Sequence, residues 1–244
     1  TVTMSLEPGY YLFLVSTTAN NSRIYRATSV FVQVKDGNVN VYAGEGKNKL
    51  TGPDYEVALK HAAAPEVEKT VWDNTTAITP AWRSAAAGTV GEVMNFRLAI
   101  NVPIYTDVAN LPVFKLTDVL DGFQYVKDSA KVYTAVSGLT YTSEVADAIS
   151  NTTAGAYDET TGAQTVTFDL DYLKIKGSAV SSVTVHLTYQ ATMMPAAVKT
   201  DRAVLGAADA TVYNYAENTA RLTYNTSLNP TQIDSDASTA RVFT

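Results

Sequence analysis

The chain has 244 residues, a net charge of −6 and no cysteine. The lack of cysteine excludes disulfide bonds and thiolate zinc sites, and the acidic balance without a Lys/Arg cluster argues against nucleic acid as a partner. No run of about 18 apolar residues occurs, so we expect no insertion of this segment into a membrane. The 15 tyrosines, with abundant valine and threonine, are typical of an all-β protein.

The first residues carry strand patterns. Residues 9–15 follow a Pro-Gly turn and are apolar on both faces, which predicts a central strand. Residues 31–35 and 38–42 flank Asp36-Gly37, a strong hairpin signal. These strands make only part of a sandwich. We therefore interpret residues 1–50 as the C-terminal part of a β-sandwich domain whose first half lies upstream.

The strand pattern lapses in the next segment. Residues 51–65 begin with Thr51-Gly52-Pro53, and residues 56–64 have weak helical character. This composition predicts a linker with one short helix. The alternative is an excursion of the first domain.

From residue 66 to residue 244, apolar and polar residues alternate. The clearest runs are residues 94–102, 165–172 and 183–190, and residues 241–244 predict a last strand. Such alternation indicates antiparallel strands with one buried and one solvated face, so the predicted fold is all-β, with Ig-like antiparallel β-sandwich modules in tandem. A helical turn is expected within residues 143–153.

Three of the predicted strands carry a polar residue in an otherwise apolar row. By strand alternation, Lys69 shares its face with two valines, Asp118 with phenylalanine and leucine, and Asn218 with alanine and leucine. Burial of each group without a partner would be strongly unfavourable. We therefore predict that these three side chains meet in the core.

A buried amine beside a carboxyl and a carboxamide can react. Burial lowers the pKa of an amine and raises that of a carboxyl, so both can be neutral. The neutral amine can then attack the amide carbon, while the carboxyl polarises the carbonyl and carries protons. Loss of ammonia would leave an amide bond between the two side chains. The reaction occurs once per molecule, so no turnover enzyme is expected.

The three motifs resemble those of a known family. Residues 67–71, 116–120 and 218–224 match, in order, the K-x-V, D-x-L and N-x-A-x-L-x-Y patterns of the isopeptide-forming D2 domains of sortase-assembled Gram-positive pilins. The resemblance covers residues 66–244. It implies a CNA-type sandwich with an intramolecular Lys69–Asn218 bond, Asp118 as the catalytic acid/base, and no cofactor or metal. It also implies a pilus or cell-wall-anchored surface location, with other pilin subunits, the sortase machinery and a host surface ligand as partners.

Residues 1–44 resemble the closing half of the preceding pilin domain. In shaft pilins, a V-x-V-Y motif like that of residues 39–42 is followed by Pro-Lys, and sortase joins that lysine to the next subunit. Here Ala43-Gly44 follow, and the nearest lysines, Lys47 and Lys49, are displaced. The departure argues against a shaft role and leaves an ancillary or tip pilin, or a pilin-like adhesin, as alternatives.

Alternatives exist for each residue of the predicted site. Lys69 could extend its amine to the edge of the sheet, and Asp118 could cap a turn. Asp121 is the second candidate acid. Asn214, which has the same strand parity as Asn218, is the second candidate acceptor.

Other candidate residues have simpler interpretations. The two histidines are expected at the surface, the tryptophans in core or linker contacts, and the two aspartates near the end in a solvated loop rather than a calcium site. These residues are His61, His186, Trp72, Trp82, Asp234 and Asp236. The rival functions are an Ig-like module that binds a host protein or glycan without an internal bond, and an accessory sandwich of a glycoside hydrolase.

Overall fold

The computed structural model of the chain divides into two compact units, Thr1–Ala63 (unit 1) and Ala64–Thr244 (unit 2). The structure describes residues 5–15, 23–25, 28–43, 48–50, 61–75, 79–104, 113–199, 204–205, 212–226 and 229–244.

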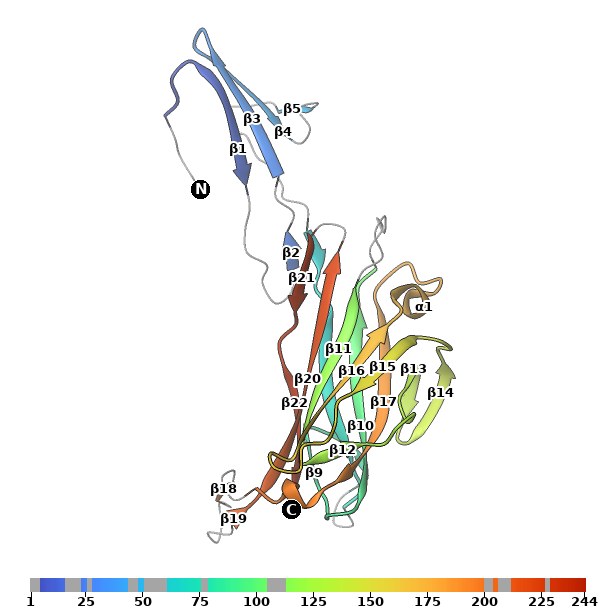
Figure 1. Cartoon of the computed structure of the whole chain (residues 1–244). Coiled ribbons are helices and arrows are strands. Elements are labelled where there is room, and N and C mark those ends of the chain that lie inside the picture. The colour runs from blue at the N-terminus through green and yellow to red at the C-terminus, as the bar shows by residue number, and fades with distance from the viewer. Residues whose placement is uncertain are drawn as a thin grey trace. The chain divides into compact units, whose positions relative to one another are not determined.

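Unit 1 contains a four-stranded antiparallel sheet in the order β1-β3-β4-β5 (Figure 1). A separate pair joins β2 to β6. Asp36 and Gly37 connect β3 to β4 with positive φ angles of 52° and 74°, as the tight turns of two-residue hairpins require. The predicted hairpin is therefore confirmed. The strands of this unit are β1 (Gly9–Val15), β2 (Arg23–Tyr25), β3 (Thr28–Lys35), β4 (Asn38–Ala43), β5 (Asn48–Leu50) and β6 (His61–Ala63).

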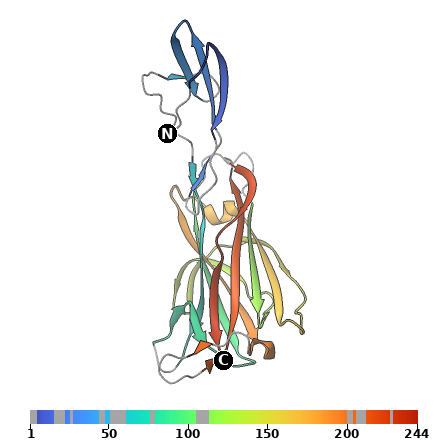
Figure 2. The same cartoon turned by 90° about the vertical axis from the view of Figure 1, so that its left-hand side faces the viewer.

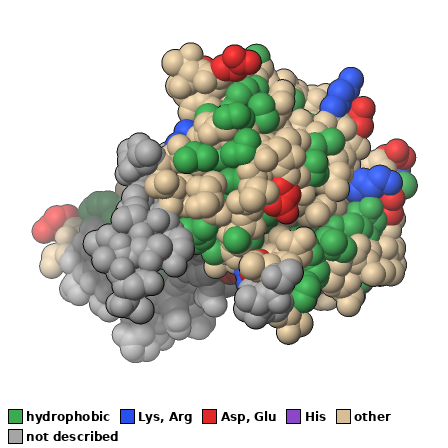
Figure 3. All heavy atoms as spheres, turned by 90° about the horizontal axis from the view of Figure 1, so that it is seen from below, with side chains coloured by type: hydrophobic (Ala, Val, Ile, Leu, Met, Phe, Trp, Pro, Cys, Tyr) green, Lys and Arg blue, Asp and Glu red, His purple; other side chains and the backbone are tan. Residues whose placement is uncertain are grey.

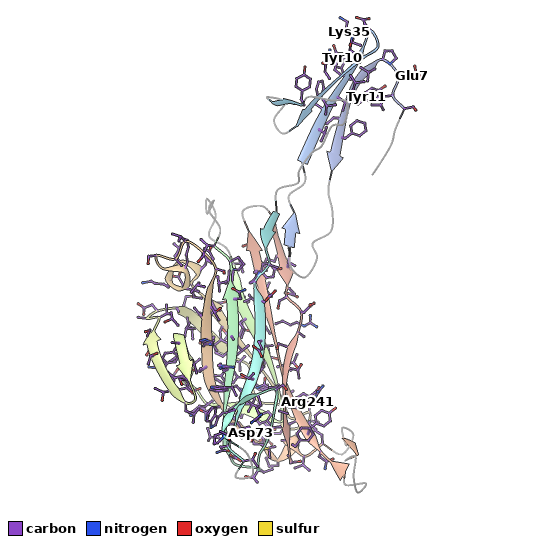
Figure 4. The ribbon with its side chains drawn as sticks, turned by 180° about the vertical axis from the view of Figure 1, so that it is seen from behind. Glu7, Tyr10, Tyr11, Lys35, Asp73 and Arg241 are labelled. Carbon is purple, nitrogen blue, oxygen red and sulfur yellow. The ribbon has the colours of Figure 1, made fainter. Side chains whose placement is uncertain are left out.

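The sheet of unit 1 buries one face. Its core consists of Val30, Val32 and Val41. On the opposite face of β1, Tyr10 is 70% and Leu12 73% exposed (Figure 4 labels Tyr10). Within the described residues β1 pairs with β3 alone, so the prediction of a central strand buried on both faces is wrong for this part of the chain. The reason is that apolar residues on both faces of a strand do not by themselves supply a second layer to cover them.

A short helix was predicted between residues 56 and 64. Its first part, residues 56–60, lies outside the described residues. Where the structure describes the end of this segment, His61–Ala63 form strand β6. The helical prediction is wrong there, because these residues pair with Arg23–Tyr25. Long-range pairing of this kind overrides a weak local preference.

Unit 2 consists of two sheets that face each other (Figures 1 and 2). One sheet, here called the lysine sheet because it contains Lys69, has the strand order β14-β13-β17-β10-β7-β8, with β12 also paired to β17. The other, the asparagine sheet, has the order β15-β16-β11-β20-β22-β9, with β21 also paired to β20. The predicted all-β sandwich class is thus confirmed.

The strands of unit 2 pair antiparallel within both sheets, except that β22 runs parallel to β9. Two short helical segments, α1 (Tyr172–Lys176) and η1 (Pro195–Ala197), lie between strands, and β18 (Val204–Leu205) pairs with β19 (Val212–Tyr213). The remaining strands are β7 (Glu66–Asp73), β8 (Ala81–Arg83), β9 (Ala85–Ala87), β10 (Val93–Val102), β11 (Phe114–Asp121), β12 (Phe123–Tyr125), β13 (Lys131–Ser137), β14 (Thr140–Glu144), β15 (Ile149–Ala154), β16 (Ala163–Leu170), β17 (Val183–Met193), β20 (Tyr215–Thr226), β21 (Asn229–Asp234) and β22 (Ser238–Phe243).

The core of unit 2 lies between the sheets and follows the predicted alternation. On β10, each second residue is buried while the intervening ones are partly exposed. The same pattern holds on β16 and β11. Full burial of one such aliphatic or aromatic side chain contributes roughly 1.5–3 kcal/mol, so these inward rows hold the two sheets together.

Two local predictions in unit 2 are wrong. The alternating run ends at Leu170, and Tyr172 begins helix α1 because the Asp171 carboxylate accepts hydrogen bonds from the amides of Leu173 and Lys174 at 2.9 and 3.1 Å. This is an N-cap, which competes with continuation of the strand. The expected helical turn within residues 143–153 is instead strand at both ends, since β15 adds to the edge of β16.

Candidate functional site

Lys69 lies on β7 with its side chain between the two sheets. The residue is 2% exposed, and its side chain is 0% exposed. The amine donates hydrogen bonds to both carboxylate oxygens of Asp118 and to Oδ1 of Asn218. The amine is therefore fully enclosed and does not extend to the edge of the sheet.

Asp118 and Asn218 come from neighbouring strands of the opposite sheet. On β11, Asp118 pairs with Ala220 of β20, and Asn218 of β20 pairs with Leu120 of β11. The two polar residues are therefore diagonal neighbours on one face, and both are fully buried. The structure brings together all three side chains of the predicted site, across a sequence separation of 149 residues between Lys69 and Asn218.

Tyr189 completes the cluster, although the sequence did not predict it as part of the site. Its hydroxyl group donates to Oδ2 of Asp118 at 2.7 Å and accepts from Nδ2 of Asn218 at 2.7 Å and from Nζ of Lys69 at 3.0 Å. The available signal was its place in the inward row of β17, because a buried tyrosine hydroxyl group usually needs a hydrogen-bond partner.

Aromatic rings surround the cluster. Nζ of Lys69 lies 5.4 Å from the ring centroids of both Phe96 and Tyr189, and these two rings stack at 5.5 Å. Phe168 and Tyr125 contact the Tyr189 ring at 5.8 and 6.0 Å. The four polar groups thus satisfy one another inside an apolar shell, where electrostatic interactions are stronger than in water.

Burial shifts the pKa values of two of these groups. It lowers the pKa of Lys69 to about 8, although the Asp118 charge acts in the opposite direction. About a tenth of such an amine is neutral at pH 7, far more than for a solvated lysine. Burial, and then the Asp118 charge, raises the pKa of Tyr189 well above its usual value of 10.0. The tyrosine hydroxyl group therefore keeps its proton at neutral pH.

The two alternative site residues lie elsewhere. Asp121 ends β11 and forms an ion pair with Lys199 at 2.9 Å. Asn214 precedes β20, and its backbone carbonyl accepts from the amide of Thr244 at 3.0 Å. Asp118 lies within β11 and not at a turn. The geometry therefore favours Asp118 and Asn218 over their alternatives.

The remaining candidates have structural surroundings. Trp72 and Trp82 pack edge to face at 5.4 Å, and Trp82 Nε1 donates to the Gly138 carbonyl at 2.8 Å. His186 is half-buried rather than at the surface as expected, and burial lowers its pKa. The remaining three are His61, the first residue of β6; Asp234, which ends β21 and accepts a hydrogen bond from Thr223; and Asp236, in the segment before β22.

The described part of the chain contains no group of three or more His, Cys, Asp or Glu residues arranged to hold a metal ion. None of its helices is long and apolar enough to cross a membrane. On the face of the molecule in Figure 3, apolar side chains are interspersed with polar and charged ones. The candidate functional site is the cluster of Lys69, Asp118, Tyr189 and Asn218.

Fold and site together define a β-sandwich protein whose two sheets meet through a buried Lys–Asp–Asn cluster. No family model and no curated protein matches the chain. Several solved structures are similar. The AgI/II polypeptide BspA C-terminal domain of Streptococcus agalactiae has a TM-score of 0.49 and 16% identity, covering 91% of this chain and 59% of that chain.

Two pilins are also similar in structure. The major pilin subunit BcpA of Bacillus cereus has a TM-score of 0.44 and 14% identity, covering 90% of this chain and 55% of that one. Domains D2 and D3 of the major pilin SpaD of Corynebacterium diphtheriae have a TM-score of 0.40 and 17% identity, covering 71% and 51%. The chain thus spans between half and three fifths of the length of these structures.

Proposed function

We propose that the chain is part of a pilin or pilin-like surface adhesin in which an autocatalytic isopeptide bond joins Lys69 to Asn218. The observation that carries the proposal is the direct contact of the Lys69 amine with both the Asn218 carboxamide and the Asp118 carboxylate in a closed apolar core. The ordered motifs around these residues add support, because they resemble those of isopeptide-forming pilin domains.

The proposed reaction needs no external reagent. Once Nζ has lost the extra proton of its ammonium form, the neutral amine attacks Cγ of Asn218 to form a C–N bond, and Asp118 takes up the proton that Nζ releases on attack. Asp118 acts as acid and base while the bond from Cγ to Nδ2 breaks. One ammonia is released, and one new amide remains between the two side chains.

The fold supplies most of what this reaction requires. The packing of apolar side chains between the two sheets holds the amine and the carboxamide in contact. The entropy of bringing these two groups together is therefore already lost on folding. Such proximity and orientation can lower a barrier by roughly 7–11 kcal/mol. The apolar shell also favours the neutral amine over the ammonium form.

The cross-link would serve a protein under tension. Lys69 lies on β7, the first strand of unit 2, and Asn218 lies on β20, near the C-terminal end of unit 2. By the chain-entropy model, a bond that closes a loop of this length stabilises the fold by roughly 5 kcal/mol. It would also prevent extension of all residues between the two strands. This suits a fibre or stalk exposed to shear, assembled with other pilin subunits by sortase on a Gram-positive cell surface.

Intact-mass spectrometry with peptide mapping tests the proposal. The wild-type protein should lack the mass of one ammonia and yield a peptide pair joined through Lys69 and Asn218. Lys69→Ala should restore the full mass. Lys115→Ala is the matched control, because Lys115 is half-exposed on β11 and pairs with Asp169 at 3.6 Å; it should lack the ammonia as the wild type does.

An unmodified wild-type mass would contradict the isopeptide bond. The cluster would then be a buried hydrogen-bond network, and the chain would be better described as an adhesin-type binding module without an internal bond.

A further inference from the structure

We infer that Tyr189 is a catalytic residue of this reaction, whose hydroxyl group passes a proton from Asp118 to the departing Nδ2 nitrogen of Asn218. The inference rests on the proposed isopeptide reaction and assigns the group through which the proton of Asp118 reaches the departing nitrogen, because Nδ2 hydrogen-bonds Tyr189 and not Asp118. It follows from the orientation of the Asn218 carboxamide and from the position of the hydroxyl group.

The orientation of the Asn218 carboxamide is determined by its neighbours. The lysine amine donates hydrogen bonds, so the amide atom that accepts from Nζ of Lys69 is the oxygen Oδ1. The nitrogen Nδ2 then points to the hydroxyl group of Tyr189 at 2.7 Å. Among the described residues, this hydroxyl group is the one hydrogen-bond partner of Nδ2.

The proton balance shows why this position matters. Lys69 enters as a neutral amine with two protons on Nζ and keeps one in the new amide. Nδ2 enters with two protons and leaves as ammonia with three. One proton must therefore travel from Nζ to Nδ2. Nζ contacts the carboxylate of Asp118, but Nδ2 contacts Tyr189.

Tyr189 bridges the gap between the two ends of this path. Its hydroxyl oxygen lies 2.7 Å from Oδ2 of Asp118 and 2.7 Å from Nδ2. The hydroxyl group gives its proton to Nδ2 as the C–N bond breaks and recovers one from the protonated Asp118. The proton moves along the two existing hydrogen bonds of the hydroxyl group, to Oδ2 of Asp118 and to Nδ2 of Asn218, with the direction of donation reversed in each. No proton is gained or lost overall.

The surroundings keep this hydroxyl group protonated and in place. Its pKa is raised by burial, so the hydroxyl group is available as a donor. Tyr189 is 2% exposed, and its ring stacks on Phe96 at 5.5 Å and contacts Phe168 at 5.8 Å. A general acid held at hydrogen-bond distance from the leaving group typically accelerates such a step by about 10²–10⁴-fold.

The test compares Tyr189→Phe with Tyr125→Phe in the full chain. Both changes remove one hydroxyl group from the same aromatic cluster, since the two rings lie 6.0 Å apart. The Tyr125 hydroxyl group, however, takes no part in the hydrogen bonds that join Lys69, Asp118, Tyr189 and Asn218. The protein is made in a short pulse of cell-free synthesis and then held at pH 6. At this pH most Lys69 is protonated, so we expect cross-linking to be slower than folding. Intact-mass measurements over time follow the loss of ammonia.

We expect cross-linking of Tyr189→Phe to be at least about tenfold slower than in the wild type, and Tyr125→Phe to react at the wild-type rate. Circular dichroism should show both variants folded. Site-specific 3-fluorotyrosine at position 189, which makes the donor more acidic, should speed the reaction, and the same substitution at position 125 should not.

A Tyr189→Phe rate within threefold of the wild type would overturn the inference while leaving the isopeptide bond intact. A slow Tyr189→Phe variant with no fluorotyrosine effect would also overturn it, because the hydroxyl group would then only orient the amide. Failure of the wild type itself to lose ammonia would instead disprove the reaction on which the inference depends.

Discussion

The backbone amide of Lys69 donates a hydrogen bond to the hydroxyl group of Ser238 at 2.8 Å. This contact joins β7, the first strand of the lysine sheet, to β22, the last strand of the asparagine sheet. The side chain of the same lysine reaches Asn218 on β20, which pairs with β22. One residue thus connects the first strand of unit 2 to two of its last three strands, to β22 through its backbone and to β20 through its side chain.

The stability of the protein should depend on the proposed Lys69–Asn218 bond. We expect Asn218→Ala to unfold at a temperature lower by on the order of 10 °C, because the closed loop contributes roughly 5 kcal/mol. Thermal unfolding followed by circular dichroism measures this. Asn95→Ala, which removes a surface amide that accepts from Gln190 at 3.0 Å, is the control and should change the midpoint little. Equal midpoints for Asn218→Ala and wild type would contradict a stabilising cross-link.

Asp118 should control the rate at which the bond forms. Asp118→Asn keeps an oxygen acceptor for the Lys69 amine but cannot take up its proton, so we expect cross-linking to slow by about 10²–10⁴-fold. The time course of ammonia loss by intact mass gives the rate. Asp121→Asn removes a carboxylate that pairs with Lys199 outside the cluster, and it should leave the rate unchanged. Slowing in Asp121→Asn instead would assign the acid/base role to that residue.

The rate of cross-linking should rise with pH. The pKa of Lys69 is lowered to about 8, so the neutral, nucleophilic fraction grows about tenfold per pH unit below this value and saturates above it. We expect the rate to increase from pH 6 to pH 8 and then to level off. Pulse-chase samples held at each pH and analysed by intact mass give the profile. A rate that is independent of pH between 6 and 8 would mean that the lysine reacts from a different protonation state.

The same pKa predicts how stability changes with pH when the bond cannot form. In Asn218→Ala, the folded chain releases the Lys69 proton near pH 8, whereas the unfolded chain keeps it until its usual value of 10.5. The unfolded state then binds more protons, so stability rises with pH above about 8, by at most about 1.4 kcal/mol per unit. Urea unfolding at pH 7.5, 8.5 and 9.5 measures the slope. The double variant Lys69→Met, Asn218→Ala should lack it, and a persisting slope would implicate other groups.

Gly122 should be intolerant of a side chain. Its φ is +86°, and an added Cβ would lie 2.6 Å from Cα of Ala197. We expect Gly122→Ala to destabilise the protein by about 2–4 kcal/mol, from left-handed backbone strain and overpacking together. Gly91→Ala separates these causes, because Gly91 has a φ of +87° with nothing within 4 Å of the added atom. Urea unfolding of both variants gives the comparison, and equal losses would show that the contact with Ala197 relaxes freely.

Much of the site could be predicted from strand parity. An alternating row places each second side chain on one face, so Lys69, Asp118 and Asn218 could each be assigned to a buried face from its own strand alone. The long strands of unit 2 follow from the same local rule, as β10 and β22 show. Parity acts within a few residues and does not depend on which strands become neighbours.

The pattern of apolar residues misled where a local interaction changed the backbone or where an apolar face is exposed in the described part of the chain. Tyr172 has the parity of a strand residue, yet the Asp171 cap starts a helix there. The exposed face of β1, with Leu12 at 73%, has the apolar pattern of a buried one. In the first case a local hydrogen bond changed the backbone conformation, although Tyr172 is still buried; in the second, an apolar face is exposed within the described residues.

Tyr189 and the choice between Asn214 and Asn218 were decided only by the tertiary structure. Parity cannot distinguish two asparagines four residues apart on one face, and it cannot show that a tyrosine from a third strand reaches the same point. Which asparagine and which tyrosine reach Lys69 depends on the position of β17 and β20 along the strands that face them. That position is set by the packing of the two whole sheets. The sequence by itself determined which groups had to be buried, since a polar side chain in an apolar row is visible locally; the fold determined which of them meet, since contact across a sandwich depends on residues far apart in the chain.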